Sequence, residues 1–355
     1  MEPVRIGVIG CGVIGTGAHL PTCARSELLE CVAVADLIPE RVAAAAERFG
    51  VPKTYPSGLD LLADREVEVV ILALPAGVRT PLARAALKAG KHVLIEKPIA
   101  SNVAEVRELI ALRGGLTAGC CSSRMRWTPS ARAATACLAS GALGELRVVR
   151  ARAVLPAGPA PTSPPPPWRA SFGLNGGGIL VNWGCYDLDY LLGICDWQLR
   201  PESVLAQWWP VAEHLRARVD PASDADNHFI ALIRCAGGSV ISFERGEFTA
   251  ASRDEAWQII GSRGSLSLWL HSTKGKELRL DTTDAEAGVR SQTLWSGDED
   301  GADHNRGVLE DFAHAVRAGG QPSTSLERAF VMQAVTDAIY ESARSGASAA
   351  VATLE

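Results

Sequence analysis

A lysine at the end of a short apolar run is the residue whose type and position point most directly to chemistry. Residues 93–95 are apolar, Gly90 precedes them, and Glu96, Lys97 and Pro98 follow, a pattern that predicts a buried strand. In open α/β sheets ligands bind outside the carboxyl ends of the strands, so a lysine there is a candidate for chemistry. An isolated lysine is more commonly a surface residue, and the rest of the sequence must decide between the two.

A second short motif indicates a nucleotide site. Residues 4–9 predict a strand, and the string GCGVIG follows directly at residues 10–15. Glycines at this spacing permit a tight turn and a close approach of the backbone to pyrophosphate, whose charge is stabilised by the N-terminus of the next helix. The residues expected to hold the cofactor here are Gly10, Gly12, Val13, Ile14 and Gly15.

An acidic residue lies where a dinucleotide site needs one. The next apolar run, residues 29–35, ends in Asp36, about 20 residues after Gly15, where an acid takes the ribose hydroxyls of NAD. Its charge would repel the 2′-phosphate of NADP, so NAD is the expected cofactor. Arg41 is near enough in the sequence to keep NADP as the alternative.

These motifs belong to an alternating pattern of strands and helices. Strands are expected at residues 67–74, 93–95 and 116–121, and helices at 39–49, 81–89 and 103–112. Such alternation means parallel pairing through right-handed crossovers, so residues 1–122 are expected to form a Rossmann domain. Leu74 and Pro75 follow a strand end, and their loop is expected to lie over the cofactor, the alternative being a loop without contact.

The pattern changes after Cys121, and residues 123–355 are expected to form a second domain. Residues 145–154 predict a strand, while 229–234 with 239–244 and 257–260 with 266–270 predict two hairpins. Helices are expected at 307–318 and from about 326 to Ala343, and this last helix is able to pack back on the first domain. A sheet with one face against helices leaves its other face for pairing between subunits.

A proline-rich stretch interrupts this domain between residues 155 and 168. Such a run favours extended polyproline geometry and does not fit a central strand. It is interpreted as a stiff surface loop, with an arm at the cleft or a subunit contact as the alternative.

Polar side chains follow three consecutive glycines at residues 176–178. Asn182, Tyr186, Asp189 and Tyr190 have the spacing i, i+4, i+7 and i+8, which places them on one face of a predicted helix. Aromatic residues at this spacing are usually part of a core. Polar neighbours on the same face favour a cleft lining.

Composition narrows the function further. The chain has 355 residues, 47% of them hydrophobic, and a net charge of −5, which argues against nucleic acid or an anionic membrane as the main partner. It holds neither an apolar stretch of about 20 residues nor a basic leader, and a cytoplasmic location is expected. The nine cysteines form no Cys-x-x-Cys pair and are expected to be reduced and mostly buried, without a metal. His228 and His304 are expected to be structural.

The combined motifs resemble those of the Gfo/Idh/MocA oxidoreductases, named for glucose–fructose oxidoreductase, inositol dehydrogenase and rhizopine catabolism. The resemblance rests on GCGVIG at 10–15, AGKHVLIEKP at 89–98 and GGG at 176–178, which leads into Asn182, Gly184, Tyr186 and Asp189. It implies an α/β protein with an N-terminal Rossmann domain and a C-terminal α+β domain built on a large, mostly antiparallel sheet. It also implies oxidation or reduction of sugars, cyclitols or related diols with NAD or NADP.

The resemblance assigns roles by position. Lys97 resembles the family's active-site lysine, and Tyr186 occupies a place that holds histidine in many members and tyrosine in others. Asn182 stands where aspartate is usual, and an amide cannot take a proton, so Asn182 is expected to orient the substrate. Three further residues are expected to orient the substrate, Asp189, Arg124 and Arg169, and Glu96 and Lys97 are expected to contact the cofactor.

The expected reaction is hydride transfer between nicotinamide C4 and a carbinol or ketone carbon, with Lys97 and Tyr186 as the proton-moving pair. Burial and the cofactor's charge would lower the pKa of Lys97, and a nearby ammonium would lower that of Tyr186. Glu96 is expected to orient Lys97 or pair with a neighbour, and Pro98 to fix the lysine through a cis bond. Two alternatives are an NAD-dependent glycosidase that uses transient oxidation and a non-catalytic NAD(P)-binding protein. The expected assembly is a homodimer or homotetramer through the C-terminal sheet.

Overall fold

A computed structural model describes residues 2–163, 165–270 and 274–354, which form two compact units. The first unit contains the chain up to Arg124 together with residues 302–333, and the second contains residues 125–301 and 334–353. Each unit is therefore built from segments that are separated in the sequence.

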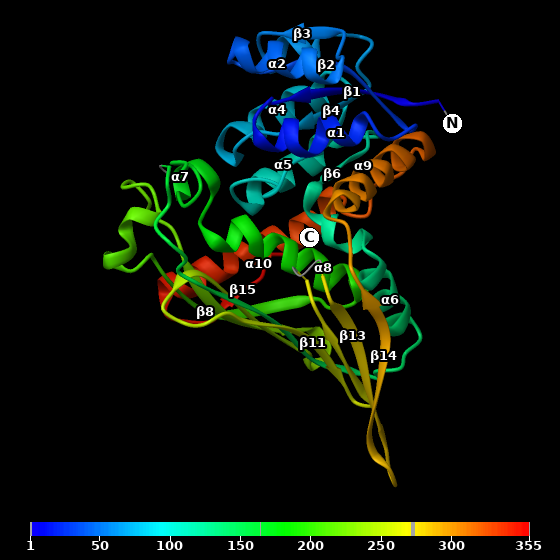
Figure 1. The fold of residues 1–355 in the computed structure, drawn as a ribbon, viewed down its shortest axis with the longest axis vertical. Coiled ribbons are helices and arrows are strands. Elements are labelled where there is room, and N and C mark those ends of the chain that lie inside the picture. Colours follow the sequence, from blue (N-terminus) through cyan, green and yellow to red (C-terminus); the bar gives the residue numbers. More distant parts are fainter. Residues whose placement is uncertain (1, 164, 271–273, 355) are drawn as a thin grey trace. The chain divides into compact units, whose positions relative to one another are not determined.

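The first unit is organised around a six-stranded sheet in the order β3-β2-β1-β4-β5-β6 (Figure 1). All its strand pairs are parallel, and its central strands are apolar and buried, as parallel strands with both faces covered require. The elements, in chain order, are β1 Val4–Ile9, η1 Gly15–His19, α1 Leu20–Cys23, β2 Leu29–Ala35, α2 Pro39–Phe49, β3 Lys53–Tyr55, α3 Gly58–Leu62, β4 Val69–Leu72, α4 Ala76–Lys88, β5 His92–Ile95, α5 Val103–Arg113 and β6 Ala118–Cys120. The expected parallel α/β domain is confirmed.

A segment from near the end of the chain completes this unit. Helix α9 spans Gly301–Ala318, and α10 spans Leu326–Ser345, with its first part in the first unit and the rest in the second. Between these helices the chain extends the sheet beyond β6, because the Cys120 amide donates to the Thr324 carbonyl at 3.0 Å. Near the end of α9, Arg317 donates to both oxygens of Glu68, at 3.0 and 3.1 Å.

The Glu68–Arg317 pair is expected to make the stability of the first unit depend on pH. Hydrogen bonds from Arg317 lower the pKa of Glu68 to about 2 from an ordinary value of 4.5. A lowered folded-state pKa stabilises the fold above the ordinary value and loses that contribution as pH falls towards the folded-state value. Glu68→Gln should therefore cost about 1–2 kcal/mol at pH 7 because the pair is partly exposed.

Urea unfolding of the full chain between pH 7 and pH 3 measures this effect. The difference between wild type and Glu68→Gln should shrink as the pH drops below about 4.5. Glu47→Gln, a change at an exposed glutamate of α2, serves as the matched control and should have little effect. A cost that stays constant over this pH range would contradict the assignment.

The second unit is organised around a nine-stranded sheet in the order β14-β13-β12-β11-β7-β10-β9-β8-β15. Only the pairing of β10 with β7 is parallel among its strand pairs in the described residues, so this sheet is mostly antiparallel, as expected. Its elements are η2 Cys121–Trp127, which begins in the first unit, α6 Pro129–Ala139, β7 Leu146–Pro156, α7 Phe172–Asn175, η3 Leu180–Gly184, α8 Cys185–Ile194, β8 Pro201–Trp209, η4 Glu213–Arg218, β9 His228–Cys235, η5 Ala236–Gly238, β10 Val240–Thr249, β11 Asp254–Gly261, β12 Gly264–Leu268, β13 Lys276–Asp284, β14 Gly288–Gly297 and β15 Ala349–Ala350.

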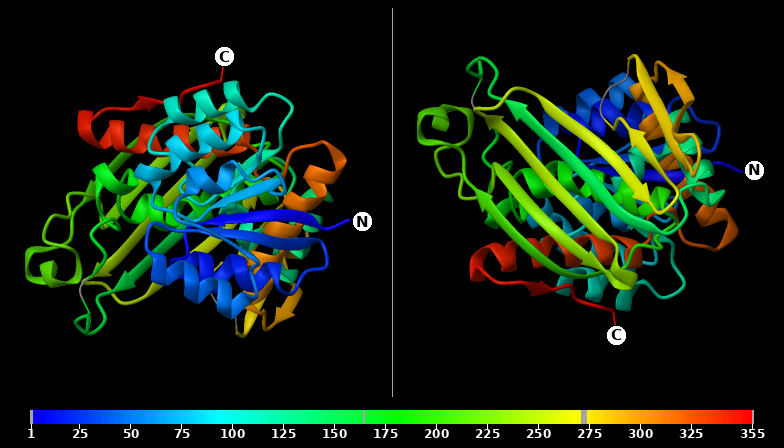
Figure 2. Two further views of the ribbon diagram at one scale, coloured as in Figure 1. Left: turned by 90° about the horizontal axis from the view of Figure 1, so that it is seen from above. Right: turned by 90° about the horizontal axis from the view of Figure 1, so that it is seen from below.

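The two faces of this sheet differ in character. Along β9, buried and exposed residues alternate: Phe229, Ala231 and Ile233 are buried, whereas Ile230 and Leu232 are exposed. This period of two is expected when helices cover only one face. Figure 2 shows the strands from their uncovered side in its right-hand view. The face without helices is called the open face below.

The sequence predicted most element types and missed several ends. Both hairpins, β9 with β10 and β11 with β12, pair as expected. Helix α9 begins at Gly301, six residues before the predicted start at residue 307. The predicted helix over Asn182 and Tyr186 is divided, because its first turn is the π-helix η3 and α8 begins at Cys185. The proline-rich stretch forms neither helix nor strand at residues 157–163 and 165–168; Pro164 lies outside the described residues.

The cysteines and the polarity of the helices complete the description of the fold. All nine cysteines are free thiols, and every one except the half-buried Cys31 is buried. Within the described residues, the helices are too short or too polar for any of them to cross a lipid bilayer.

Candidate active site

The glycine loop of the first unit has the shape that a pyrophosphate requires. A Cβ at Gly15 would lie 2.1 Å from the Gly10 carbonyl oxygen, and one at Gly10 would lie 2.4 Å from that of Ala73, so both positions must stay bare for the turn to close. A Cβ at Gly12 would meet nothing within 4 Å, which leaves open space beside the backbone. The side chain of Val13 is exposed next to it. These features fit a bound dinucleotide.

Asp36 is held in a fixed orientation at the end of β2. Its Oδ2 accepts a hydrogen bond from the Cys11 amide at 2.8 Å, and its Oδ1 accepts one from the Ile38 amide at 3.0 Å. The carboxylate is thus tied to the glycine loop itself. Its remaining acceptor capacity suits the hydroxyl groups of a ribose.

The Glu96–Lys97–Pro98 segment follows β5, at the carboxyl edge of the parallel sheet. The Lys97–Pro98 peptide bond is cis, as the sequence predicted. Glu96 is buried, and its Oε2 accepts a hydrogen bond from the Lys97 amide at 3.0 Å. Lys97 is half-buried. Glu96 therefore holds the main chain of the lysine, one of the two roles expected for it.

Buried partners keep Glu96 ionised. His19 Nε2 lies 2.8 Å from its Oε1, and the Arg124 guanidinium pairs with the same oxygen. Burial opposes the charge, yet Arg124 and His19 together hold the pKa of Glu96 well below its ordinary value. Arg124, expected to orient the substrate, is itself buried against this carboxylate.

Arg79 of α4 is a residue that the sequence reading missed. It is 1% exposed, and its Nη1 donates to the Leu74 carbonyl at 2.7 Å and to that of Lys97 at 3.4 Å. Its Nη2 also donates to the Pro98 carbonyl. One guanidinium therefore links the predicted cofactor loop at Leu74 and Pro75 to the lysine segment. An arginine inside an otherwise ordinary amphipathic helix carries no local signal of this role.

Three potential metal ligands lie together in the first unit, although no sequence spacing indicated them. The ligand atoms of His19, Glu96 and Cys121 are within 4.8 Å of one another. Burial raises the pKa of the Cys121 thiol well above its ordinary value, and a protonated thiol is a poor ligand. The charge of Glu96 is already balanced by Arg124. The chemistry of this group favours an internal hydrogen-bond network.

In the second unit, Asn182 lies 5% exposed on η3. Its Oδ1 accepts from Asn175 Nδ2 at 3.1 Å, and its Nδ2 donates to the Arg169 carbonyl. The Arg169 guanidinium in turn pairs with Glu247 Oε2 at 2.6 Å. The structure thus brings two residues predicted to orient the substrate into one cluster and adds Glu247, which the sequence reading did not single out.

Two of the three glycines before η3 pack against a buried aspartate and its tyrosine partner. Asp226 accepts hydrogen bonds from the Gly178 and Leu180 amides at 2.7 and 2.8 Å and from the Tyr340 hydroxyl at 2.6 Å. A Cβ at Gly178 would lie 1.8 Å from the Asp226 carbonyl oxygen, and one at Gly177 would lie 2.0 Å from the Tyr340 hydroxyl. Close packing therefore requires glycine at positions 177 and 178, and the positive φ of Gly177 adds to this requirement.

Helix α8 carries Tyr186 and is fixed to the sheet by its neighbour Asp187. Arg245 of β10 donates to both Asp187 oxygens, at 2.6 and 2.9 Å, and Trp257 Nε1 of β11 donates at 3.2 Å. Tyr186 is 6% exposed, and its ring meets that of Trp183 edge-on at 5.7 Å. Because Tyr186 is adjacent to Asp187, this buried network sets where the tyrosine lies.

Asp189 and His228 lie beside charged partners. Asp189 is 0% exposed, and its Oδ1 lies 2.7 Å from Arg126 Nε, so the carboxylate serves an internal ion pair of the second unit. His228 Nε2 lies 3.0 Å from Glu244 Oε1. His304 lies in α9.

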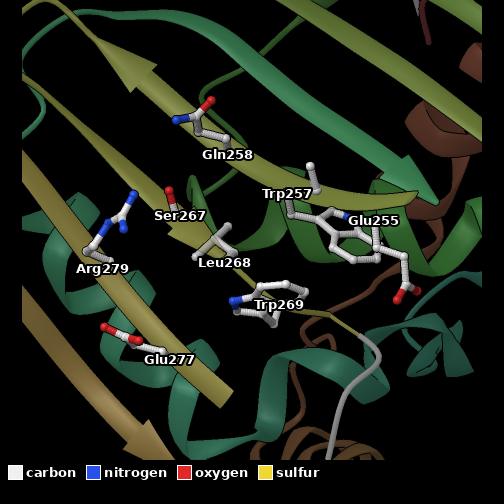
Figure 3. A pocket seen from close by; sticks show the side chains of 9 residues that line it. Glu255, Trp257, Gln258, Ser267, Leu268, Trp269, Glu277 and Arg279 are labelled. Atoms are coloured by element: carbon white, nitrogen blue, oxygen red, sulfur yellow. The ribbon is translucent and has the colours of Figure 1, made fainter. Parts of the chain in front are cut away.

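A depression of about 360 Å³ lies elsewhere on the second unit, over β11, β12 and β13. Figure 3 shows the side chains of Gln258, Ser267, Trp269 and Arg279 around it. None of the residues predicted for the active site lines it. This depression therefore does not bear on the proposed chemistry.

Comparison with known proteins covers both units. A family model described as "Oxidoreductase family, NAD-binding Rossmann fold" matches residues 4–114, and one described as "GFO/IDH/MocA C-terminal domain" matches residues 131–267. Together these matches include the glycine loop, the lysine segment and the stretch from Arg169 to Glu247.

Individual relatives match over most of their length. The dTDP-3,4-didehydro-2,6-dideoxy-alpha-D-glucose 3-reductase of Streptomyces violaceoruber is 29% identical, with 90% of this chain and 87% of the relative covered. The myo-inositol 2-dehydrogenase of Thermotoga maritima is 25% identical, with 91% of each chain covered. The solved structure of a levoglucosan dehydrogenase in complex with NADH and L-sorbose shares the fold, with a TM-score of 0.83, 22% identity and coverage of 99% of this chain and 100% of the other.

Proposed function

We propose that this chain, which belongs to the Gfo/Idh/MocA family of NAD-binding oxidoreductases, transfers a hydride between nicotinamide C4 and a carbinol or ketone carbon of a sugar, cyclitol or related diol. The observation that carries the proposal is the lysine segment, where Lys97 follows β5 at the carboxyl edge of a sheet whose glycine loop fits a dinucleotide. Relatives that act on a dTDP-sugar and on myo-inositol support the substrate class.

Each group in the proposed site has a role. The glycine loop and Asp36 hold the cofactor, and bound nicotinamide supplies the hydride acceptor or donor. Lys97 and Tyr186 are the groups we propose to move the hydroxyl proton. Asn182 and Arg169 orient the substrate, while Arg79 and Glu96 position the lysine segment through its main chain.

The cofactor proposed is NAD, with NADP as the alternative. Asp36 accepts two main-chain hydrogen bonds, so its carboxyl group is held in an orientation that disfavours a 2′-phosphate. Arg41 lies in the next helix, α2, and its positive charge would favour the 2′-phosphate of NADP.

A substrate panel tests the proposed function. Levoglucosan, myo-inositol, D-glucose and trans-1,2-dihydrobenzene-1,2-diol are each mixed with the protein and either NAD or NADP. We expect the absorbance of the reduced cofactor to increase only when both the protein and one of these compounds are present. Cofactor binding without turnover on the whole panel, in both directions, would reject the proposed reaction.

We further propose that the chain works as a homodimer or homotetramer in the cytoplasm. The open face of the second unit exposes Leu205, Trp209, Ile230 and Leu232 by 54%, 44%, 43% and 53%, and clustered apolar exposure of this kind marks contact surfaces. Leu205 and Leu232 are cross-strand neighbours. The nine free thiols fit a reducing compartment.

Leu232→Glu is expected to shift the protein towards monomers, because it would bury a charge in the proposed contact. Analytical ultracentrifugation measures the outcome against the chain mass of 37.5 kDa. Leu59→Glu, at an equally exposed leucine of α3 in the first unit, is the matched control and should leave the mass unchanged. A monomeric wild type at micromolar concentration would contradict the proposal.

A further inference from the structure

The end of strand β10 has an unusual backbone. Its pairing with β7 runs in register from Val240 to Gly246 and then shifts before Thr249. Within this bulge Phe248 has a φ of +54°, a left-handed conformation that bulky residues rarely adopt. Bulges re-aim side chains and are over-represented beside active sites. The residue that immediately precedes Phe248 is Glu247.

Glu247 points to the covered face of the sheet. Alternation along β10 puts Phe243, Arg245 and Glu247 on one side and Glu244 on the other. Arg245 pairs with Asp187 of α8, so the side shared with Glu247 is the one that α8 covers. The residue is 9% exposed, which makes it a buried carboxylate on the same face of the sheet as the helix of Tyr186.

The neighbours of Glu247 are residues of the proposed substrate site. Its Oε2 accepts a hydrogen bond from Arg169 Nη2 at 2.6 Å, and the Arg169 carbonyl accepts one from Asn182. The Glu247 amide donates to the Asn227 carbonyl at 3.0 Å, and Asn227 Nδ2 donates back to the Glu247 carbonyl. These four residues, joined by side-chain and main-chain hydrogen bonds, are called the Glu247 cluster below: Arg169, Asn182, Asn227 and Glu247.

Two acceptors in this cluster have unused capacity. The hydrogen bond from Arg169 goes to Glu247 Oε2, and among the described residues Oε1 receives no side-chain donor. Asn227 Oδ1 is buried and likewise lacks a hydrogen-bond partner within the described parts of the chain. A buried acceptor left unsatisfied is costly, so a ligand hydroxyl that donates to Asn227 Oδ1 has an energetic advantage, and Glu247 Oε1 offers a second acceptor. The guanidinium of Arg169 adds a donor for the hydroxyl oxygen.

We infer that Glu247 binds the substrate directly and that the Glu247 cluster recognises neighbouring hydroxyl groups on a polyol. This assignment rests on the proposed function and names the chemical feature that the enzyme selects. A carboxylate has two acceptor oxygens and no donor, so it distinguishes a diol from an analogue in which one hydroxyl is replaced by hydrogen. The amide of glutamine in the same place has one acceptor fewer and introduces a donor.

Binding to the NADH-loaded full-length protein tests this inference without relying on turnover. Isothermal titration with levoglucosan, myo-inositol and D-glucose is compared between wild type and Glu247→Gln, and the tightest polyol is then compared with its single-deoxy analogues. Glu247→Gln should weaken polyol binding by about 10- to 100-fold and reduce discrimination against one deoxy analogue. NADH affinity should not change.

Glu244→Gln is the matched control, because it makes the same change on the same strand but on the opposite face, beside His228. It should leave polyol binding unaltered. Equal polyol affinity in wild type and Glu247→Gln would overturn the inference, and so would a wild type that binds none of the three polyols. If Glu247→Gln does not fold, the binding data for wild type decide. The inference is overturned if wild type binds each deoxy analogue as tightly as the parent polyol.

The same samples separate this inference from the proposed function. Polyol binding that depends on Glu247 without any NADH-linked turnover would reject the proposed reaction and leave the recognition site standing. Turnover whose KM and kcat are both unchanged in Glu247→Gln would instead reject the recognition site and leave the proposed reaction standing.

Discussion

Lys97→Met is expected to lower kcat by about 10²-fold or more while NADH binding stays as in wild type. Methionine keeps an unbranched side chain but removes the ammonium that is proposed to move or stabilise the hydroxyl proton. The main chain at this position is held by Glu96 and Arg79 through the Lys97 amide and carbonyl. The segment should therefore keep its place when the side chain changes, and the loss should appear in the chemical step.

Steady-state kinetics on the best substrate of the panel, together with NADH fluorescence titration, measures the two quantities separately. Lys91→Met is the matched control, because Lys91 lies just before the same strand and its ammonium donates to the Asp64 and Val67 carbonyls at 2.7 Å each. That control should lower stability and leave kcat of the folded enzyme within about twofold. Wild-type-like kcat in both Lys97→Met and Tyr186→Phe would remove the catalytic assignment.

The pH profile of kcat distinguishes the two candidate proton carriers. If Lys97 is the base in the oxidative direction, the rise of activity with pH should vanish in Lys97→Met and persist at a lower level in Tyr186→Phe. The opposite pattern would assign the proton to Tyr186.

Asp187→Ala is expected to lower the free energy of unfolding by about 3–5 kcal/mol. The change would leave the 2%-exposed Arg245 without its bidentate partner and Trp257 Nε1 without its acceptor. An uncompensated buried guanidinium is among the most costly defects that one substitution introduces. Thermal and urea unfolding of the full chain measure the loss.

Asp254→Ala is the matched control for this prediction. Asp254 also pairs with an arginine on the same sheet, Arg152 of β7, but the two side chains are 53% and 44% exposed, so the cost should stay below about 1 kcal/mol. The double variant Asp187→Leu with Arg245→Met should recover much of the lost stability, because it removes both charges of the pair and leaves neither of them buried alone. Equal costs for Asp187→Ala and Asp254→Ala would refute the argument.

The sequence predicted well those features that local patterns encode. The parallel sheet follows from apolar runs separated by helical segments, and the glycine loop with Asp36 follows from a motif whose spacing has a physical cause. Strand β14 was missed because seven of its ten residues are exposed and none is buried, so its sequence carries no alternating apolar signal. Strand β3 has three residues, too few for any periodicity to be recognised.

Candidate site residues could be proposed from the sequence where they lie at the ends of elements, but not where they depend on contacts distant in the sequence. Lys97 was found from its place after an apolar run. Arg79, His19 and Glu247 act through partners that are many residues away, and no spacing rule connects them. The bulge beside Glu247 likewise has no signal in the sequence, because phenylalanine is not a residue type that favours a positive φ.

The discontinuous make-up of the two units has a consequence for how the protein is made on the ribosome. Residues 302–333 complete the first unit and residues 334–353 complete the second. During synthesis the sheet of the first unit emerges early, yet the Cys120 amide at its β6 edge lacks the Thr324 carbonyl until residue 324 has been added. Neither unit can therefore reach its complete native structure before the residues that follow Gly301 have been synthesised.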